Sequence, residues 1–505
     1  MELITASEAA ALITNGATLV SGGFGSCGHP DVLTKALRDS FLRTGMPSNL
    51  TLLFAAGQGD KAGKGLDQLA LDGLVKKAIG GFWGLCPALA KMAVEGRIEA
   101  HNWPQGAISK LFSRIAAGEP GLITKIGLGT FVDPAIEGGV IGASGADPIV
   151  EPISIKGEDY LLYPSMKVDY ALLRGSVSDE CGNISFESET SFMDAMAQAQ
   201  AVKNCGGKVI VQVKKITASG NLKPAEVKVP SFLVDFVVLA DDAEHPQTYG
   251  RHYEAAYTSR TGNAPPVALD EVAMAKRVIA SRAARELANY PGANINLGIG
   301  IPAIVGAYAK KIGVADFTLT VESGVVGGVP DEGLSFGASL NPQAIVEQAA
   351  LFDFYDGGGL DVSFLGFGEV DRFGNVNVSK FGERLPGAGG FINISQTAKN
   401  IYFCGTATTR GNTLSVDAAG RVTNVTQGKI SKFVNEVGQL TFNADTALRR
   451  GQQVHYITEF GLFKLTESGI ELVEIVAGVG IDIIRDVVPF HFDVAIDLKE
   501  VVCVI

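Results

Sequence analysis

The sequence predicts an α/β protein built from two homologous open α/β domains with mainly parallel sheets. Three observations predict this fold class: runs typical of buried strands alternate with helical patterns, glycine-rich turns follow several of the strand runs, and two segments recur at fixed spacing. The chain has 505 residues, of which 46% are hydrophobic and 19% charged. This is a globular composition with enough apolar material for about two to four domains.

The first predicted strand is ATLVSGG at 17–23, and a helical pattern follows it at 30–45. Pro30 is expected at the first helical position, where its missing N–H costs nothing. Further strand-like runs lie at 49–57, 208–216 and 231–240. Strands that alternate with helices in this way favour parallel pairing, because each crossover helix covers a face of the sheet.

Two internal similarities indicate duplication. Residues 168–185 resemble residues 360–377 at a constant offset of 192. The matching pairs are Asp169 and Asp361, Leu173 and Leu365, Asp179 and Asp371, Gly182 and Gly374, and Asn183 and Asn375. The glycine-rich strand exit at 15–30 also resembles 291–302, at an offset of about 276. We therefore expect one half to be a copy of the other.

The predicted domains are residues 1–240 and 269–505, joined by a linker at 241–268. The linker stretch is polar and aperiodic and contains Pro265-Pro266. Ligands of open α/β sheets collect beyond the carboxyl ends of the strands, so we expect a site in the cleft between the halves. The loops that follow strands in both halves should then carry the chemistry.

Composition argues against several classes of function. The net charge is −12 and no basic run is visible, which argues against nucleic-acid binding. The N-terminus lacks the pattern of a signal peptide, and charges interrupt every long apolar stretch, so neither secretion nor a membrane span is expected. The six cysteines are scattered without a CxxC pair, which is typical of reduced thiols and gives no metal site. We expect a cytoplasmic protein.

The segment GFGSCG at 23–28 matches the G-x-G-x-x-G pattern of dinucleotide-binding proteins. That pattern also requires an acidic residue about 20 positions further on, whereas the first acid after the next strand is Asp60. The related segment GIGIP lacks the third glycine. Nicotinamide binding is therefore disfavoured. Two interpretations stay open: a structural turn that lets helix pack on strand, or backbone amides that line a CoA or acyl group.

Glu322 ends an extended, β-branched run at 316–322, and a glycine-rich loop follows it. A glutamate at a strand exit is often a solvated carboxylate, but the glycines at 324, 327 and 328 would let a substrate approach this one. With a usual pKa near 4.3, a glutamate is ionised at neutral pH and can act as a nucleophile without a partner base. Glu322 is accordingly a candidate nucleophile.

Attack on a thioester carbonyl creates an oxyanion that hydrogen-bond donors stabilise. Gly389 and Gly390, within PGAGGF at 386–391, could direct peptide N–H groups into the site. Gln105, within NWPQGA at 102–107, offers an amide that can donate without a change of charge, although a capping or packing amide is the alternative. No G-x-S-x-G motif and no histidine in a metal-ligand motif competes.

These segments resemble the class I CoA-transferases, in particular the single-chain acyl-CoA:acetate and 3-ketoacid CoA-transferases with two fused halves. The resemblance covers essentially the whole chain. The segments that carry it are NGATLVSGGFGSCGHP, NWPQG, GLGTFVDP, NLGIGIP, TVESGVVGG, FDFYDGGGLDVSFL and PGAGGFINIS. Glu322 lies in Val-Glu-Ser-Gly, whereas the two-subunit branch has Ser-Glu-Asn-Gly, which argues against a succinyl-CoA:3-ketoacid enzyme.

The resemblance implies a pair of open, Rossmann-like domains of the CoA-transferase/NagB-like type. It implies that Glu322 forms an acyl-glutamyl anhydride and then a glutamyl-CoA thioester. It further implies that Gln105 contacts the reacting carbonyl, that Gly298, Ile299 and Gly300 approach CoA, and that Gly389 and Gly390 contact CoA or the oxyanion. CoA would be a substrate, no metal or other cofactor would be needed, and the protein would be a homodimer or homotetramer. Acyl-CoA hydrolysis by the same glutamate and a non-catalytic CoA sensor stay open as alternatives.

Overall fold

The computed structural model of the protein describes residues 1–142, 145–260 and 269–505. The chain packs into two compact units, and neither unit is one continuous stretch. Unit 1 contains residues 1–264, 321–353 and 382–393, and unit 2 contains residues 265–320, 354–381 and 394–505. The predicted boundaries at 240 and 269 divide the chain into homologous halves, which are not the same as packing units, and they stay predictions. Of the predicted linker, residues 261–268 lie outside the described residues.

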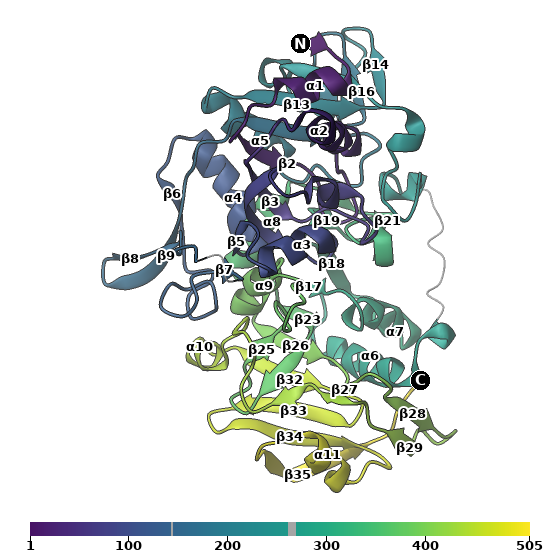
Figure 1. Ribbon diagram of the computed structural model, residues 1–505. Helices are drawn as coiled ribbons and strands as arrows, with labels where there is room; N and C mark the ends of the chain where they lie inside the picture. Colours follow the sequence, from purple (N-terminus) through teal and green to yellow (C-terminus); the bar gives the residue numbers. More distant parts are fainter. Residues whose placement is uncertain (143–144, 261–268) are drawn as a thin grey trace. The chain divides into compact units, whose positions relative to one another are not determined.

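Unit 1 is built on a nine-stranded sheet in which all neighbours are parallel except β5 and β7 (Figure 1). In spatial order its strands are β1 (Glu2–Leu3), β16 (Phe236–Leu239), β13 (Lys208–Val213), β10 (Tyr170–Arg174), β2 (Thr18–Ser21), β3 (Leu50–Ala56), β4 (Val75–Phe82), β5 (Glu99–Asn102) and β7 (Val140–Ile141). Two smaller sheets adjoin it: β14 (Lys215–Thr217), β11 (Val177–Asp179), β12 (Ile184–Ser185) and β15 (Val227–Val229); and β6 (Gly121–Thr124), β9 (Glu158–Pro164) and β8 (Glu151–Ile155).

Helices cover both faces of this sheet, because successive residues of its central strands are buried on opposite sides. Val20 packs in one apolar core with the inner faces of α4 (Gln105–Ala116) and α5 (Ala195–Asn204). Its neighbour Leu19 packs in a second core with α1 (Ala6–Leu12), α2 (Asp31–Thr44) and α3 (Pro87–Val94). Unit 1 is thus a three-layer α/β structure, as the continuous apolar strands predict.

Unit 2 holds a second large sheet. The strands of this sheet that belong to unit 2 are, in spatial order, β18 (Phe317–Val321), β17 (Ala293–Leu297), β23 (Val362–Gly366), β26 (Asn400–Cys404), β32 (Gln453–Ile457), β33 (Gly461–Thr466), β34 (Gly469–Val476) and β35 (Asp493–Val501). The strands from β18 to β32 are parallel, and β33 then runs antiparallel to both of its neighbours. The apolar faces of α6 (Met274–Glu286) and α7 (Val305–Lys311) pack against β17 and its neighbours.

The remaining elements of unit 2 are short. They are β24 (Glu369–Asp371), β25 (Val376–Asn377), β27 (Thr408–Thr409), β28 (Thr413–Val416), β29 (Val422–Thr426), β30 (Ile430–Ser431), β31 (Phe433–Val434), α10 (Ala444–Arg449) and α11 (Ile481–Val487).

The two sequence similarities correspond to matching structures. β10, β11 and β12 of unit 1 begin and end 192 residues before β23, β24 and β25 of unit 2. In both copies an aspartate accepts two backbone N–H groups and an asparagine side chain across a turn: Asp179 with Asn183 at 2.9 Å, and Asp371 with Asn375 at 3.0 Å.

The second sequence similarity also corresponds to a hydrogen bond that both copies share. Asp169 accepts the N–H of Thr18 on β2, and Asp361 accepts the N–H of Asn294 on β17. Thr18 and Asn294 are 276 residues apart, which is the offset of the second similarity. These shared contacts support the interpretation that the two copies have a common origin.

Three local expectations are revised. Pro30 is the residue before α2 rather than its first residue, and Gly45 ends that helix in the left-handed conformation. The run at 208–216 is two strands, β13 and β14, of which the second pairs in a different sheet. The run at 231–240 begins with a short 3₁₀ turn at Ser231–Leu233 before β16, since Pro230 precedes it.

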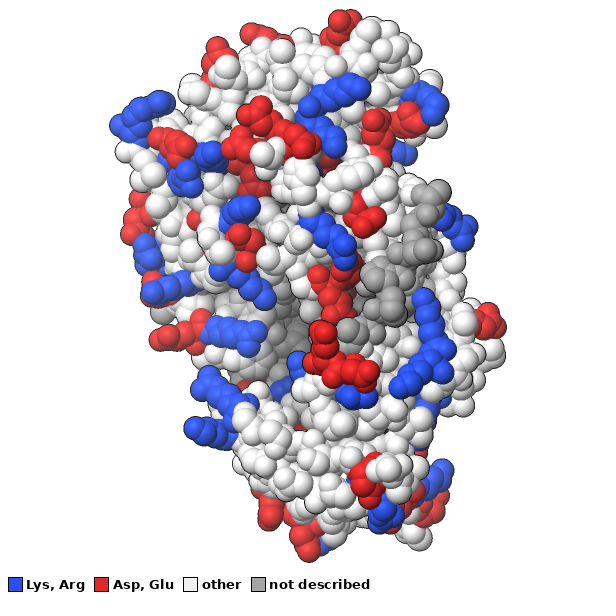
Figure 2. Space-filling model, turned by 90° about the vertical axis from the view of Figure 1, so that its right-hand side faces the viewer, with Lys and Arg blue, Asp and Glu red and all other residues white. Residues whose placement is uncertain are grey.

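The charged side chains on one face of the molecule are of mixed sign. On the face shown in Figure 2, lysine and arginine side chains are interspersed with aspartate and glutamate. Among the described residues, no helix is both long enough and apolar enough to span a bilayer.

Removal of Phe364 should destabilise unit 2. Its ring is fully buried on β23 and stacks on Tyr402, which also stacks on His455, at centroid distances of 5.1 and 4.9 Å. Phe364→Ala should lower the free energy of unfolding by about 3–5 kcal/mol, as measured by urea denaturation. Ile496→Ala, at a fully exposed position of β35, is the control and should change it by less than about 0.5 kcal/mol. Equal effects of the two changes would contradict this account of the core.

Candidate functional site

Glu322 is the first residue after β18, in a turn that belongs to unit 1. The turn is fixed at its next residue, Ser323: its hydroxyl donates to the carbonyl of Gly337 at 2.6 Å, and its own carbonyl accepts the hydroxyl of Ser191. Gly324 has a φ of +105° and lies against the backbone of Val346, so a side chain there would clash. The two residues after Glu322 are therefore fixed in position by their contacts within unit 1.

The Glu322 side chain is half-buried and sits among apolar and glycine neighbours. A Cβ atom at Gly390 would lie 3.0 Å from the Glu322 carboxyl carbon and 3.2 Å from the ring of Phe352. Within the residues that the structure describes, no hydrogen bond or ion pair to the Glu322 carboxyl is found. Burial disfavours the charged form of the carboxyl, and with no cation or hydrogen-bond donor to offset this effect the pKa of Glu322 is raised to about 7.

This pKa corrects one prediction. The sequence argument takes Glu322 as fully ionised at neutral pH, whereas in the fold a large fraction is protonated near pH 7. The reason is desolvation: the turn places the carboxyl beside Gly390 and Phe352 with no cation or donor among the described residues to offset the lost water. Once ionised, a carboxylate from which water is excluded is weakly solvated, and weak solvation makes it a better nucleophile.

Gln105 opens α4 and is fully buried within unit 1. Its backbone N–H donates to the carbonyl of Gly389 at 2.9 Å, so this helix start is tied to the second glycine loop. A Cβ atom at Gly389 would lie 3.7 Å from the Gln105 side-chain oxygen. Gln105 and Glu322 therefore lie beside two consecutive glycines, Gly389 and Gly390, and their roles in one site stay a prediction.

The second glycine loop, Pro386–Gly390, lies directly on β4 and β5. The side-chain amide of Asn102 donates to the carbonyls of Gly80 and Gly81, and its oxygen accepts the N–H of Ala388 at 2.9 Å. Only glycine fits at position 81, because a Cβ there would come within 2.9 Å of the Gln105 backbone. Because the backbones of Gly81, Gln105 and Gly389 approach one another closely, Gln105 lies beside the loop whose next residue, Gly390, adjoins Glu322.

The backbone N–H groups of Gly389 and Gly390, both predicted to stabilise an oxyanion, differ in whether they are already hydrogen-bonded. The N–H of Gly389 donates to the carbonyl of Gly81 at 2.9 Å, so it is already bonded and cannot serve an oxyanion in this arrangement. In the described part of the chain, no acceptor is bonded to the N–H of Gly390, which adjoins the Glu322 carboxyl. A role of Gly389 in CoA contact stays a prediction.

Gly298, Ile299 and Gly300 follow β17 in unit 2. Gly298 packs against the backbone of Phe364 and Leu365, and Ile299 keeps a 55% exposed side chain. Nothing within 4 Å would meet a Cβ at Gly300, where φ is +86°. An exposed glycine turn of this kind leaves room for a ligand, and its predicted contact with CoA stays a prediction.

The first glycine loop is shaped by internal packing. Gly23, at φ +117°, lies against the side chain of Gln58, and Gly28, at φ +69°, lies against Met193. Gln58 donates to the carbonyls of Gly23 and Ala56 and accepts from Ser21. These contacts explain the glycines as a structural turn, one of the two interpretations left open by the sequence.

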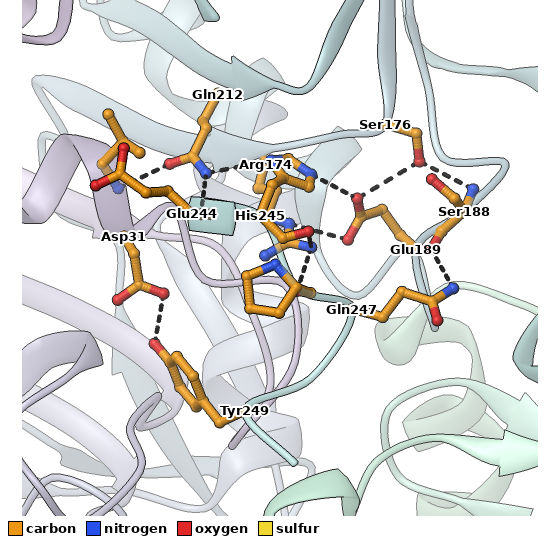
Figure 3. A network of polar contacts seen from close by, with 12 residues as sticks. Asp31, Arg174, Ser176, Ser188, Glu189, Gln212, Glu244, His245, Gln247 and Tyr249 are labelled. Atoms are coloured by element: carbon orange, nitrogen blue, oxygen red, sulfur yellow. Dashed lines mark hydrogen bonds and ion pairs between the residues drawn. The ribbon is translucent and has the colours of Figure 1, made fainter. Parts of the chain in front are cut away.

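A buried polar network lies beside this loop in unit 1 (Figure 3). Arg174, at the end of β10, pairs with Glu189 at 3.0 Å, and His245 contacts the other oxygen of the same carboxylate at 3.0 Å. Burial alone would raise the pKa of Glu189, but Arg174 and His245 outweigh it and lower this pKa to about 2. His245 belongs to the described part of the predicted linker, which is thus fastened to unit 1.

The sequence gives no signal for several residues that surround the site. Ser191 and Asp194 precede α5, and Gln348 opens α8 (Gln348–Asp356). None of them belongs to a recognisable motif of catalysis, and their relation to Gln105 depends on contacts between residues more than 80 positions apart. Among the described residues, no group of three or more histidine, cysteine or acidic side chains is placed to hold a metal ion.

Comparisons with known proteins agree on one family. A family model described as coenzyme A transferase matches residues 3–240. The chain is 40% identical to caffeate CoA-transferase of Acetobacterium woodii over 99% of this chain and 96% of that protein. It is 39% identical to acetate CoA-transferase YdiF of Escherichia coli O157:H7 over 96% of this chain and 91% of that protein.

Solved structures give the same result. The apoenzyme of acyl-CoA transferase YdiF from E. coli O157:H7 superposes with a TM-score of 0.93 at 37% identity, over 99% of this chain and 95% of that chain. A thioester complex of the same bacterial protein with CoA matches with the same TM-score, identity and coverage.

Glu322→Gln should stabilise the protein at alkaline pH. Because folding raises the pKa of this carboxyl from 4.5 to about 7, folded protein holds the proton more tightly. The stability contributed by Glu322 is therefore full below about pH 4.5 and is lost as the pH rises through about 7. At 1.36 kcal/mol per pKa unit, the neutral variant should gain up to about 3 kcal/mol at pH 8 and almost nothing at pH 4.5.

Urea denaturation of both proteins across this pH range measures the difference. Glu383→Gln, at an exposed glutamate of the same unit, is the matched control and should show no such trend. A gain for Glu322→Gln that does not depend on pH would contradict the raised pKa.

Proposed function

Because the chain belongs to the coenzyme A transferase family, we propose that it transfers CoA from a short-chain acyl-CoA to acetate or another small carboxylate through Glu322. One observation carries the assignment of the nucleophile: Glu322 is the carboxyl that lies against Gly390 with no hydrogen bond or ion pair among the described residues. The similarity to acetate and caffeate CoA-transferases supports the class of reaction.

The first step is attack of the ionised Glu322 on the thioester carbonyl. A carbon–oxygen bond forms, the carbon–sulfur bond breaks, and the products are an acyl-glutamyl anhydride and CoA thiolate. The amide of Gln105 and the N–H of Gly390 are the donors we assign to the oxyanion of this step. Gly390 adjoins the Glu322 carboxyl and its N–H has no other partner among the described residues, and Gln105 lies beside the neighbouring Gly389.

The thiolate then attacks the glutamyl carbonyl of the anhydride. This step releases the first carboxylate and leaves a glutamyl-CoA thioester on Glu322. An incoming carboxylate reverses both steps and departs as the new acyl-CoA. The energy of the thioester bond is retained throughout, so the reaction as written needs no metal, nucleotide or other cofactor. The CoA thioester complex described for YdiF supports an intermediate of this type.

Several features of the protein in the cell belong to the same proposal. We propose that Gly298, Ile299 and Gly300 bind part of CoA, that the protein acts in the cytoplasm, and that it is a homodimer or homotetramer. Short-chain acids such as acetate, propionate, butyrate or acetoacetate are the proposed acceptors. Hydrolysis would differ only in that water takes the acyl or glutamyl group, so exclusion of water from the intermediates decides between the two outcomes.

Incubation with acyl-CoA alone should leave CoA attached to Glu322. Mass spectrometry of the digested protein should show the adduct, and hydroxylamine should release the CoA. Glu322→Ala should lower kcat by at least about 10³-fold, and Glu322→Asp should also be slow because its carboxyl is one methylene shorter. Addition of acetate should convert the adduct to acetyl-CoA rather than accelerate release of free CoA. Absence of any adduct while transfer proceeds would overturn the proposal.

The rate should depend on pH through Glu322. The nucleophile is the ionised form, so kcat/KM for acyl-CoA should fall about tenfold for each unit of pH below about 7 and level off above it. Calorimetric titration of CoA binding over the same range separates loss of affinity from loss of the nucleophile. A kcat/KM that stays constant down to pH 5 would show that the pKa of Glu322 in the free enzyme is not raised.

A further inference from the structure

The ring of Phe352 occupies space beside the Glu322 carboxyl. Phe352 lies on α8 and is fully buried in unit 1. A Cβ atom at Gly106 of α4 would lie 2.5 Å from its Cδ1 and 2.7 Å from its Cγ, and a Cβ at Gly390 would lie 3.2 Å from its Cζ. The ring therefore extends from α4, at its base, to the second glycine loop, at its tip. The same Cβ at Gly390 would lie 3.0 Å from the Glu322 carboxyl carbon, so the ring tip and the carboxyl meet at one glycine.

The position of this ring is fixed by its surroundings. A side chain at Gly106 would overlap the ring, because carbon atoms pack at about 3.5–4.0 Å. The N–H of Gly106 donates to the side-chain oxygen of Asn393, on α9 (Phe391–Thr397), at 3.1 Å. The first residue of α8, Gln348, donates its backbone N–H to the carbonyl of Met193 at 3.1 Å. The ring is thus enclosed by residues that are themselves hydrogen-bonded within unit 1.

A phenyl ring in this place displaces water without replacing its hydrogen bonds. An internal water molecule needs a space of about 10–15 Å³ for its centre and two to four polar partners. The ring of Phe352 fills the space and has no nitrogen or oxygen with which to bond the carboxyl. If the ring were removed, the two oxygens of the Glu322 carboxyl would border the vacated space and could accept hydrogen bonds from water.

Water is a competing acceptor for the intermediates of the proposed reaction. At the glutamyl-CoA thioester, the oxygen of a water molecule would bond to the glutamyl carbonyl carbon as the carbon–sulfur bond breaks. One proton of the water passes to the CoA thiolate and the other to solvent, which leaves free CoA and the Glu322 carboxylate. Each such event loses the energy of the thioester bond that transfer retains.

We propose that the ring of Phe352 keeps water from the glutamyl intermediates, so that a carboxylate rather than water takes part in their breakdown. The inference rests on the proposed function, because the intermediates are those of that reaction. Phe352 makes and breaks no bond, and it acts through the space that it fills beside Glu322. The choice between transfer and hydrolysis then depends on a side chain that a CoA-binding motif would not reveal.

Removal of the ring should shorten the life of the CoA adduct. The adduct is formed on Phe352→Ala from acyl-CoA alone and separated from excess acyl-CoA by gel filtration. It should lose CoA at least about tenfold faster than the adduct of the original protein. In water labelled with heavy oxygen, mass spectrometry should find the label in Glu322, because hydrolysis leaves the oxygen of water on the carboxyl. With excess acyl-CoA, the original protein should release no more than one carboxylate per site, whereas the variant should continue.

Phe352→Met and Phe112→Ala are the matched controls. Methionine is unbranched and flexible and fills much of the same space with apolar atoms, so its adduct should lose CoA within about threefold of the original rate. Phe112 is another fully buried phenylalanine, further along α4 in the apolar core of unit 1. Phe112→Ala should lower the thermal stability without shortening the life of the adduct.

The pH profile is a readout that loss of stability alone would not move. Burial raises the pKa of Glu322 to about 7, and the ring is part of what buries the carboxyl. Water admitted by Phe352→Ala should solvate the carboxylate and lower this pKa toward its usual value. The pH at which kcat/KM for acyl-CoA falls to half should therefore decrease by about one unit or more. Phe112→Ala should leave this pH unchanged.

Circular dichroism and thermal unfolding check that the variants fold. If Phe352→Ala does not fold, Phe352→Val, which also leaves the space at the ring tip empty, decides by the same measurements. An adduct of either variant as long-lived as that of the original protein would refute the role of Phe352, and so would equal hydrolysis in Phe112→Ala. These results would leave the proposed function intact. If the unaltered protein forms no adduct while transfer proceeds, the proposed function itself fails.

Discussion

The contact of the second glycine loop with β4 and β5 is the constraint on which the site depends. Residues 386–390 belong to the second half of the sequence, yet their backbone bonds to Gly81, Asn102 and Gln105 of the first. Such contacts need positions without side chains, and the absence of a Cβ at Gly81 and Gly390 provides the space. A side chain at position 81 would clash with the backbone of Gln105, and one at position 390 would press on the Glu322 carboxyl.

This close packing has an energetic consequence for the nucleophile. The atoms that exclude water from Glu322 are the glycine backbone and the ring of Phe352, and neither can compensate a charge. Because burial raises the pKa of Glu322, ionisation of this carboxyl near neutral pH lowers the free energy of unfolding. A cation beside Glu322 would recover that stability, but it would also hold the carboxylate in its ground state and make it a poorer nucleophile.

Much of the fold could be predicted because its determinants are local. The strand–turn–strand units around Asp179 and Asp371 depend on an aspartate, a glycine and an asparagine within a few residues, and such patterns survive as sequence similarity. Within the candidate site, the sequence could single out Glu322, because a carboxyl at a strand exit before a glycine-rich loop indicates a possible nucleophile; its role stays a prediction. The occupied N–H of Gly389 and the buried carboxyl of Asp194 depend on long-range contacts, which no local pattern contains.

The duplication shows how the chemistry became asymmetric. β3 lies beside β2 in unit 1 as β18 lies beside β17 in unit 2, so β3 and β18 are equivalent strands. After β3, Gln58 uses its amide to bond two backbone carbonyls and supports the first glycine loop. After β18, the corresponding turn carries a carboxyl that is left without a partner among the described residues. The turns that follow these equivalent strands thus differ: the side chain of Gln58 is hydrogen-bonded within the fold, whereas the carboxyl of Glu322 has no hydrogen bond or ion pair among the described residues and stays available to react.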